Sequence, residues 1–395
     1  PVMGAVTPNG AEVDERMIYK GGILKELDMK SLKDIVKKCK KEKVEAIAIC
    51  LLHAYKNPTH EIQLKKRLTE LNISVEVIAS HEVTREWREY ERTSSTVLSG
   101  YVLPIAKKYL NNLENKLKEK GLKNTPYIMQ SNGGITTIND VKTNPITMVE
   151  SGPASGVFGA IALGKVIGKN DLIVLDIGGT TAKCALVENG QVKITTNYKI
   201  EHSRTQAGYP IQTPVIDIVE IGNGGGSIAW VDQGGKMHVG PKSAGAMPGP
   251  AAYGRGGKNL TTTDANIITG RIHPDYFLGG ELQPDYESIE KAARPLCKVL
   301  KGDKIDVAKG IIRIANANMI NALKLISVNK GYDPRDFTMV VIGGGGAMHG
   351  ADLARELQVS ELIVPPHAGV FSAFGMLMSD IRRDYIRTNV CTLRE

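Results

Sequence analysis

The sequence predicts an α/β protein of two domains, and three observations support this prediction. The chain has 395 residues, a length at which one hydrophobic core usually stops growing and a second domain forms. Apolar residues make up 42% of the chain, which is enough to fill the interiors of both domains. Segments of helical periodicity alternate with short apolar runs, a pattern typical of sheets covered by helices.

The first half of the chain shows this alternation most clearly. The predicted elements are a helix near 30–43, a strand near 44–52, a helix near 59–71, a strand near 73–80, a helix near 94–120 and a strand near 127–131. A small, apolar helix follows near 153–168, and the composition changes after it, at Lys169. We therefore place the domain boundary between residues 168 and 169, with 1–168 as the first domain and 169–395 as the second.

Composition and charge disfavour several classes of function. The net charge of +8 comes mostly from lysine-rich stretches at 30–43 and 107–123, whose helical spacing is typical of solvated helix faces. With only 5% aromatic residues and no nucleic-acid motif, we expect no nucleic-acid partner. The five cysteines form no C-x-x-C pair and the histidines no H-x-x-x-H pair, so we expect no zinc site and a reducing, cytoplasmic location. No apolar run reaches the roughly eighteen residues of a membrane span, so we expect no membrane partner.

The segment "LIVLDIGGTTAKCALVENGQVKITT" at 172–196 carries the strongest functional signal. Asn189-Gly190 between alternating runs predicts a hairpin, so the segment is expected to form three antiparallel strands. Gly178 and Gly179 fall in the first turn, where backbone N–H groups can approach a polyphosphate. The carboxylate of Asp176 would hold Mg²⁺ or its water shell, and Thr180 and Thr181 would offer hydroxyls to phosphate oxygens. Actin and hexokinase use this style of phosphate loop, although a plain hairpin turn also explains the segment.

Two further glycine clusters follow. Gly222 to Gly226 precede an alternating strand, a Gln-Gly-Gly turn and a return strand. The stretch 337–359 runs from a buried strand through four glycines into an amphipathic helix, whose N-terminus suits an adenosine or phosphate group. Neither cluster fits G-x-G-x-x-G and no G-x-x-x-x-G-K-[ST] occurs, so a Rossmann or Walker site is poorly supported.

Taken together, these motifs resemble the hydantoinase A / 5-oxoprolinase family, which includes acetone and acetophenone carboxylase subunits. The resemblance runs through most of the chain, in the family's order, at 81–104, 129–135, 150–157, 175–183, 222–229, 240–257, 261–272, 342–350 and 369–385. It implies an actin-like (RNase H-like) two-domain ATPase fold that works with a hydantoinase B-type subunit or domain. It also implies that ATP hydrolysis is coupled to opening a cyclic amide or to carboxylating a ketone.

The resemblance also assigns residues. Asp176 and Thr180 become the catalytic residues, with Asp176 as the Mg²⁺ ligand. The residues implied to bind ATP are Gly178, Gly179, Thr181, Gly224, Gly225, Gly344, Gly345 and Gly346. The residues implied to lie at a substrate site or cleft are Asn132, Gly133, Ser151 and Asp264. Asn132-Gly133 can equally be a turn, Asp264 a helix N-cap and His349 a structural residue.

Chemistry explains why ATP would serve such reactions. Phosphorylation of an amide oxygen makes that oxygen part of a leaving group, so that water can attack the carbon, and carboxylation of a ketone follows related logic. The sequence does not separate a cyclic-amide hydrolase from a ketone carboxylase subunit. A non-catalytic actin-like nucleotide-binding module is a third alternative.

One expected feature is missing from the first domain. An actin-like ATPase needs a phosphate loop from each domain, and no D-x-G-G or D-x-G-T hairpin occurs before residue 129. We therefore expect an incomplete first domain, in an internal portion of a longer polypeptide or in one partner of a split one. Strands such as 44–52 should then have an unpaired or neighbour-supplied edge, and the chain alone should not hydrolyse ATP.

Overall fold

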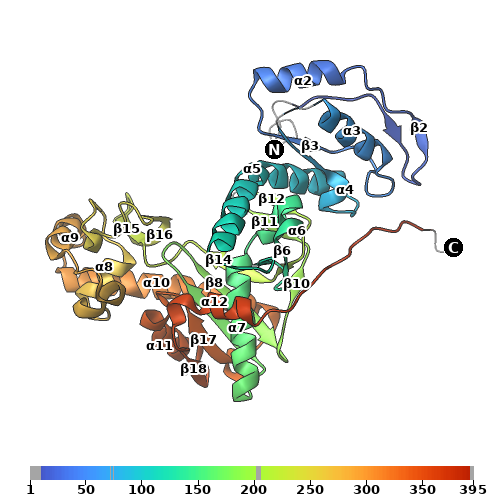
Figure 1. Cartoon of the computed structure of the whole chain (residues 1–395). Coiled ribbons are helices and arrows are strands. Elements are labelled where there is room, and N and C mark those ends of the chain that lie inside the picture. Colours follow the sequence, from blue (N-terminus) through green and yellow to red (C-terminus); the bar gives the residue numbers. More distant parts are fainter. Residues whose placement is uncertain (1–9, 72, 74, 202–205, 392–395) are drawn as a thin grey trace. The chain divides into compact units, whose positions relative to one another are not determined.

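The computed structural model describes residues 10–71, 73, 75–201 and 206–391, which fall into two compact units (Figure 1). The first unit draws on Pro1–Ser151, Ile194–Val215 and Asp380–Glu395. The second unit draws on Gly152–Lys193 and Ile216–Ser379. The chain therefore passes from one unit to the other more than once.

This division differs from the predicted boundary at 168/169, because the small apolar helix α7 (Ser151–Ile167) packs within the second unit. A Cβ atom built on Gly156 would lie only 2.6 Å from Cδ1 of Ile342, and one built on Gly159 would lie 2.9 Å from the Phe371 ring. Glycines on this helix therefore allow close packing against elements far away in sequence.

The first unit contains several short two-stranded sheets. Its strands are β1 (Arg16–Met17), β2 (Ile23–Lys25), β3 (Ala46–Ile49), β4 (Glu76–Ala79), β5 (Tyr127–Met129), β6 (Ile135–Thr137), β11 (Tyr198–Ile200) and β12 (Tyr209–Ile211). Its helices are α2 (Leu32–Lys41), α3 (Thr59–Glu70), α4 (Ser80–Val83), α5 (Glu89–Glu119) and α6 (Ile138–Thr143). Each predicted helix and strand of this region is present, with ends shifted by a few residues.

The parallel pair β3–β4 lies against α5 and beside α2 and α3. A Cβ atom on Gly100 of α5 would lie 3.3 Å from Ile78 and 3.7 Å from Ala48, so the helix packs closely on both strands. Leu32, Leu64 and Leu68 fill the space between the other helices and this pair. Within the described residues β3 pairs only with β4, and an incomplete first domain stays a prediction.

The second unit is organised around a six-stranded sheet. Five of its strands follow the order β14-β8-β7-β17-β18, and β9 pairs with β8. The sheet strands are β7 (Leu172–Ile177), β8 (Ala182–Glu188), β9 (Gln191–Val192), β14 (Ile218–Ile221), β17 (Thr338–Ile342) and β18 (Glu361–Ile363). Strands β7, β8 and β9 form the predicted antiparallel meander, and β17 and β18 run parallel to β7. An antiparallel meander continued by parallel strands is the actin-like arrangement that the resemblance implies.

Helices and a separate hairpin complete the second unit. The hairpin consists of β15 (Ser227–Val231) and β16 (Met237–Ser243). The helices are α7, α8 (Thr262–Ile268), α9 (Tyr286–Leu300), α10 (Lys304–Ile326), α11 (Gly346–Leu357) and α12 (Phe371–Leu377). The short strand β10 (Ile194–Thr195) belongs to the first unit, and β13 (Val215–Ile216) spans the point at which the chain passes to the second unit.

Helix α10 is the central helix of this unit's core. Its buried side chains include Ile311, Ala315, Met319 and Leu323, which lie in the same cluster as Ile173 of β7. Among the helices of the described residues, only the one at Lys304–Lys330 is long and apolar enough to cross a membrane. Half of its most apolar stretch is buried inside the protein. A buried core helix meets the same criterion of length and composition.

Candidate functional site

Asp176 occupies the carboxyl end of β7, between Lys183 on one neighbouring strand and Ile342 on the other. Burial raises the pKa of this carboxyl group, and the charge of Lys183 opposes the rise. The Lys183 ammonium also lies 3.4 Å from the carboxylate of Glu220. No described residue donates a hydrogen bond to the Asp176 carboxylate, so this group can accept contacts from a ligand.

The turn after Asp176 exposes backbone rather than side chains. The Gly178 amide donates to the Thr181 carbonyl over 3.0 Å and closes the turn between β7 and β8. A Cβ atom on Gly179 would meet nothing within 4 Å, and one on Gly178 would meet only the Thr181 carbonyl, at 3.7 Å. Thr180 is exposed at the tip. This turn therefore offers peptide groups and a hydroxyl to an incoming molecule.

The second glycine cluster packs against this turn through backbone hydrogen bonds. The amides of Gly225 and Gly226 donate to the carbonyls of Gly178 and Gly179 over 3.0 and 2.6 Å. A Cβ atom on Gly224 would lie 2.7 Å from the Gly178 carbonyl oxygen. The glycines are thus needed for backbone-to-backbone packing, and direct contact of Gly224 and Gly225 with a ligand stays a prediction.

The third cluster connects β17 to α11. Gly343 has a φ of +80°, and a Cβ atom there would collide with the Asp176 carboxylate. Gly345 donates its amide to the Ile177 carbonyl over 2.8 Å, and a Cβ atom on it would lie 2.7 Å from the Ile177 side chain. Only Gly344 faces open space, with nothing within 4 Å of a built Cβ atom.

Helix α11 begins at this point without a side-chain cap. Its N-cap residue, Gly345, cannot supply a capping side chain, and Gly346 is the first helical residue. The N–H groups of an uncapped first turn, together with the helix dipole, favour binding of an anion. The structure therefore brings together the turn after β7, the glycines before β15 and the start of α11 at one edge of the sheet.

Most of the chain matches the patterns of a known protein family. Residues 92–385 match the pattern described as hydantoinase/oxoprolinase, and residues 5–72 match the N-terminal region described for hydantoinase/oxoprolinase. The chain belongs to the hydantoinase/oxoprolinase family. This membership confirms the resemblance inferred from the sequence motifs.

Individual relatives support the same assignment. The chain is 42% identical over 379 residues to an uncharacterized protein of Methanocaldococcus jannaschii, covering 94% of this chain and 56% of that protein. It is 33% identical over 374 residues to caprolactamase subunit alpha of Pseudomonas jessenii, covering 94% of this chain and 53% of that subunit. The chain thus spans about half the length of the curated relatives it matches.

Solved structures share the fold. A nucleotide-free structure of acetone carboxylase superposes with a TM-score of 0.82 at 29% identity, covering 93% of this chain and 52% of that chain. The structure of ATP-dependent caprolactamase from Pseudomonas jessenii gives a TM-score of 0.76 at 32% identity, covering 93% of this chain and 53% of that chain. These likenesses confirm the predicted α/β fold.

Three of the residues predicted for a cleft belong to the first unit. Asn132 and Gly133 form the turn between β5 and β6 in the first unit, where Gly133 has a φ of +84°. The Asn132 side-chain amide donates to Asp384 over 2.8 Å. Ser151 begins α7, next to Glu150, which has a φ of +56°. The turn interpretation of Asn132-Gly133 therefore describes the local geometry.

Asp264 is fully buried in the second unit. Its carboxylate accepts hydrogen bonds of 2.8 Å from the amides of Ala252 and Thr261, another of 2.8 Å from the Thr261 hydroxyl, and one of 3.3 Å from the Ala251 amide. The N-cap interpretation is wrong in position, because Thr261 is the N-cap and Asp264 is the third helical residue of a capping box. Asp264 therefore fastens the loop before α8.

His349 is also buried, on α11. Its Nδ1 lies 2.7 Å from Oδ1 of Asn316, and its Nε2 lies 3.4 Å from the Asn266 amide nitrogen. Burial lowers the pKa of this imidazole to about 4, with the charge of Arg271 adding to the shift and that of Asp352 opposing it. A neutral, hydrogen-bonded histidine of this kind fits the structural alternative.

Sequence reasoning missed two functional neighbours of Asp176. Lys183 is paired with Asp176 across the hairpin, and the period-two alternation of a strand around a four-residue turn could have identified it. Gly343 approaches the carboxylate itself, but its positive φ leaves no trace in a run of four glycines. Within the described part of the chain, no group of three or more metal-binding side chains occurs. A metal at Asp176 would therefore have fewer than three such side chains of the described residues as ligands.

Proposed function

We propose that this chain provides the ATP-binding part of an enzyme that activates a cyclic amide for ring opening. The observation that carries the proposal is the open backbone at Gly178, Gly179 and Gly344, next to the carboxylate of Asp176. Family membership supports it, as does the likeness to a protein described as an ATP-dependent caprolactamase.

The residues present fit a bound ATP and Mg²⁺. Glycines at which a Cβ atom would meet nothing allow phosphate oxygens to approach peptide N–H groups. The uncapped start of α11 adds further N–H groups and a positive dipole end. Mg²⁺ usually keeps several waters and binds through one or two carboxylates and substrate phosphates, so the single carboxylate of Asp176 is sufficient.

Each residue then has a distinct task. The peptide groups of Gly178 and Gly179 hold the phosphates, and the Thr180 hydroxyl is available to a phosphate oxygen. Asp176 holds the metal or its water shell, while Lys183 limits the negative charge at this point of the sheet. When bound, ATP would supply the phosphoryl group that converts the amide oxygen into part of a leaving group.

A second candidate function is that of a ketone carboxylase subunit. The likeness to acetone carboxylase, with a TM-score of 0.82, favours it specifically. In both functions the glycine-lined site would have the same task of holding ATP, so the distinction lies in the second reactant.

We further propose that the chain acts together with other protein. It spans about half the length of the matched relatives, which include the alpha subunit of caprolactamase. A hydantoinase B-type subunit or domain is the proposed partner, and a second phosphate loop would come from outside these residues.

The test is ATP turnover in the complete protein with its partner subunit. ADP release is measured with caprolactam, hydantoin or 5-oxoproline, and separately with acetone plus bicarbonate. We expect a cyclic amide to stimulate release and Asp176→Ala to abolish it. Stimulation only by ketone plus bicarbonate would establish the second candidate, whereas no stimulation by either would contradict both.

A further inference from the structure

The first unit encloses a cavity that the nucleotide site does not use. Its volume is about 510 Å³, and its walls come from 81–86, 130–132, Asn144, Thr147, 212–214 and 384–387 of that unit. The size suits a small organic molecule. Three features of its wall determine which molecule would fit.

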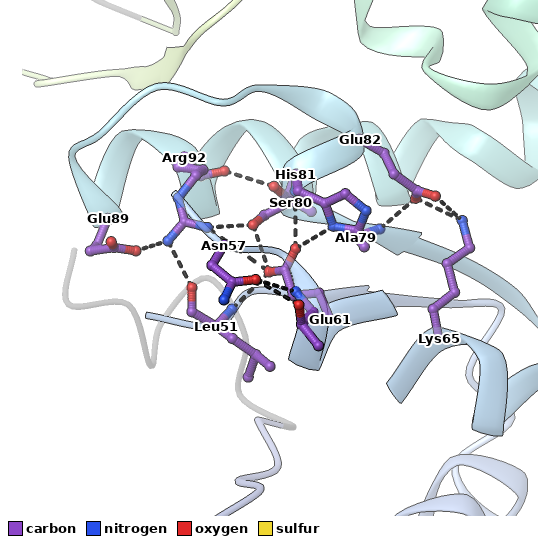
Figure 2. A network of polar contacts seen from close by, with 12 residues as sticks. Leu51, Asn57, Glu61, Lys65, Ala79, Ser80, His81, Glu82, Glu89 and Arg92 are labelled. Carbon is purple, nitrogen blue, oxygen red and sulfur yellow. Dashed lines mark hydrogen bonds and ion pairs between the residues drawn. The ribbon is translucent and has the colours of Figure 1, made fainter. Parts of the chain in front are cut away.

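The first feature is a histidine paired with a buried carboxylate. Figure 2 shows Glu61 at the centre of a polar network, with Ser80, His81 and Arg92 around it. The Glu61 carboxylate lies 2.7 Å from Nδ1 of His81 and accepts the Ser80 hydroxyl over 2.6 Å. It also accepts the backbone amides of Leu51 and His81 over 2.9 and 3.0 Å. His81 lines the cavity, and Glu61 is completely buried behind it.

This network determines which ring nitrogen of His81 carries the proton. Burial opposes ionisation of Glu61, but the hydrogen bonds from His81, Ser80 and the two amides outweigh it and hold its pKa below the ordinary value. The Arg92 guanidinium also lies 3.9 Å from the Glu61 carboxylate. An ionised carboxylate only accepts hydrogen bonds, so Nδ1 must be the protonated nitrogen. Nε2 is then the ring nitrogen left for a ligand, and no described residue is hydrogen-bonded to it.

The second feature is another unused acceptor. The Gln212 side chain lines the same cavity and is 8% exposed. Its Nε2 donates to the Trp87 carbonyl over 3.0 Å, which leaves Oε1 facing away from that bond. This Oε1 is buried and has no hydrogen-bond partner. A buried acceptor without a donor is unfavourable, so a ligand N–H group would relieve a real deficit.

The third feature is a pair of arginines without an ion pair. Of the three cavity-lining carboxylates, Glu82 is engaged by Lys65, Asp384 by Asn132 and Arg382, and Glu86 accepts a hydrogen bond of 3.4 Å from the Thr84 hydroxyl. Two cavity-lining arginines, Arg85 and Arg387, form no ion pair with any residue that the structure describes. They can therefore donate to an oxygen of a bound molecule.

We propose that this cavity binds the secondary amide group of a small cyclic amide. The amide N–H donates to Nε2 of His81 or Oε1 of Gln212, and its carbonyl oxygen accepts from Arg85 or Arg387. His81 is the contact residue, and Glu61 is a positioning residue that engages Nδ1 and thereby leaves Nε2 as the ring nitrogen available to the ligand. The inference rests on the proposed function for its choice of cyclic amides, and it adds the place and the polarity of the binding site.

A matched pair of probes tests the inference in the complete protein. Caprolactam carries the N–H group, and N-methylcaprolactam replaces it by a methyl group. We expect calorimetry to show caprolactam binding about tenfold or more tighter than the methylated probe, since one to two hydrogen bonds are lost. His81→Gln and Gln212→Leu should each reduce this preference. His238→Gln is the control, because His238 is also paired with a carboxylate, Asp232, but lies in the second unit.

The ring proton of His81 provides a test that needs no variant. Nitrogen-15 NMR of the protein at neutral pH should show His81 protonated at Nδ1, with its Nε2 resonance shifted by caprolactam. A proton on Nε2, or equal binding of the two probes, would overturn the inference.

Failure here is distinguishable from failure of the proposed function. Amide-stimulated ATP turnover that His81→Gln leaves unchanged would overturn the cavity assignment and retain the function. Selective caprolactam binding without any stimulated turnover would retain the cavity assignment and overturn the proposed function.

Discussion

Asp176 illustrates a conflict between stability and function in one side chain. Burial raises the pKa of its carboxyl group above the ordinary value of 3.8. The unfolded chain therefore releases this proton at lower pH than the folded chain, so the group reduces stability as the pH rises above about 4. The same half-buried, unpartnered carboxylate is what a metal ion requires.

We expect Asp176→Asn to stabilise the folded protein and to inactivate it. The gain in the free energy of unfolding should grow as the pH rises from about 4 to 7, because the amide cannot ionise. ATP turnover in the complete enzyme should fall by a hundredfold or more, since several kcal/mol of charge stabilisation are lost. Urea titrations and ADP release measure the two effects.

Asp232→Asn provides a control of opposite sign. The hydrogen bond from His238 holds the pKa of Asp232 below its ordinary value, so its amide variant should lose rather than gain stability near neutral pH. A destabilised Asp176→Asn variant would contradict the assignment.

Neighbouring glycines at the start of α11 should respond differently to a side chain. Gly344→Val places its side chain in open space, so we expect the fold to persist and ATP affinity to fall at least tenfold. Gly345→Val pushes against Ile177 instead and should destabilise the protein by about 1–3 kcal/mol. Calorimetric titration and thermal unfolding of both variants check this contrast. Unchanged affinity in the Gly344 variant would show that no ligand approaches there.

The lowered pKa of His349 predicts how the free energy of unfolding depends on pH. Its pKa is lowered to about 4 in the folded protein, so the unfolded chain binds a proton first as the pH falls. The free energy of unfolding is unaffected by this group above about pH 6.5. It falls progressively down to about pH 4, by roughly 3 kcal/mol in total, as the unfolded chain takes up the proton. His349→Gln should flatten the fall in unfolding free energy over this interval. A variant with the wild-type slope would show that another group controls it.

Two aspartates near helix starts allow the stability contributed by a buried side chain to be compared with that of an exposed cap. Asp303 caps α10 from an exposed position by accepting one amide, that of Asp306, so Asp303→Ala should cost about 1 kcal/mol. Asp264 satisfies four buried donors, three of them backbone amides, so Asp264→Ala should cost at least about 3 kcal/mol. Urea denaturation of both variants measures the difference. Equal losses would mean that water replaces Asp264 at the amides.

Elements that depend on local pattern could be predicted from the sequence. The Asn189-Gly190 step identified the turn between β8 and β9, and the apolar run before Asp176 identified β7. The pairing of Glu61 with His81 could not be predicted, because the two residues lie on different helices and nothing local links them. Burial of Asp264 could likewise not be predicted, since its partners Ala251 and Ala252 belong to a separate 3-10 helix and no local pattern links them to it.

The assignment of segments to units was the least predictable property. Periodicity shows that a helix has an apolar face but not which core receives that face. Helix α7 follows the first unit in sequence and packs in the second. Residues 194–215 and 380–391 are short and polar enough to resemble surface loops, yet they belong to the first unit.

The segment after Ser379 should stabilise the first unit specifically. The backbone of Ile135 exchanges hydrogen bonds with Asp380 and Arg382, and Thr388 donates to the Arg85 carbonyl. Ending the chain at Ser379 should therefore speed amide exchange in β6 while leaving β7 and β17 protected. A chain ending at Cys391 retains these contacts and is the control. Equal exchange in both proteins would contradict a stabilising role.

Because the chain passes between the units more than once, the first unit cannot be completed until late in synthesis on the ribosome. The first unit begins to emerge first, but residues 380–391, which pair with β6 and wall the cavity, emerge after the second unit is finished. At common translation speeds the interval between Ser151 and Asp380 lasts roughly ten to fifty seconds. During that time the edge of β6 beside Ile135 is an uncovered template for foreign strands. The region around β6 is thus completed only after the second unit has emerged, and it would gain from a chaperone.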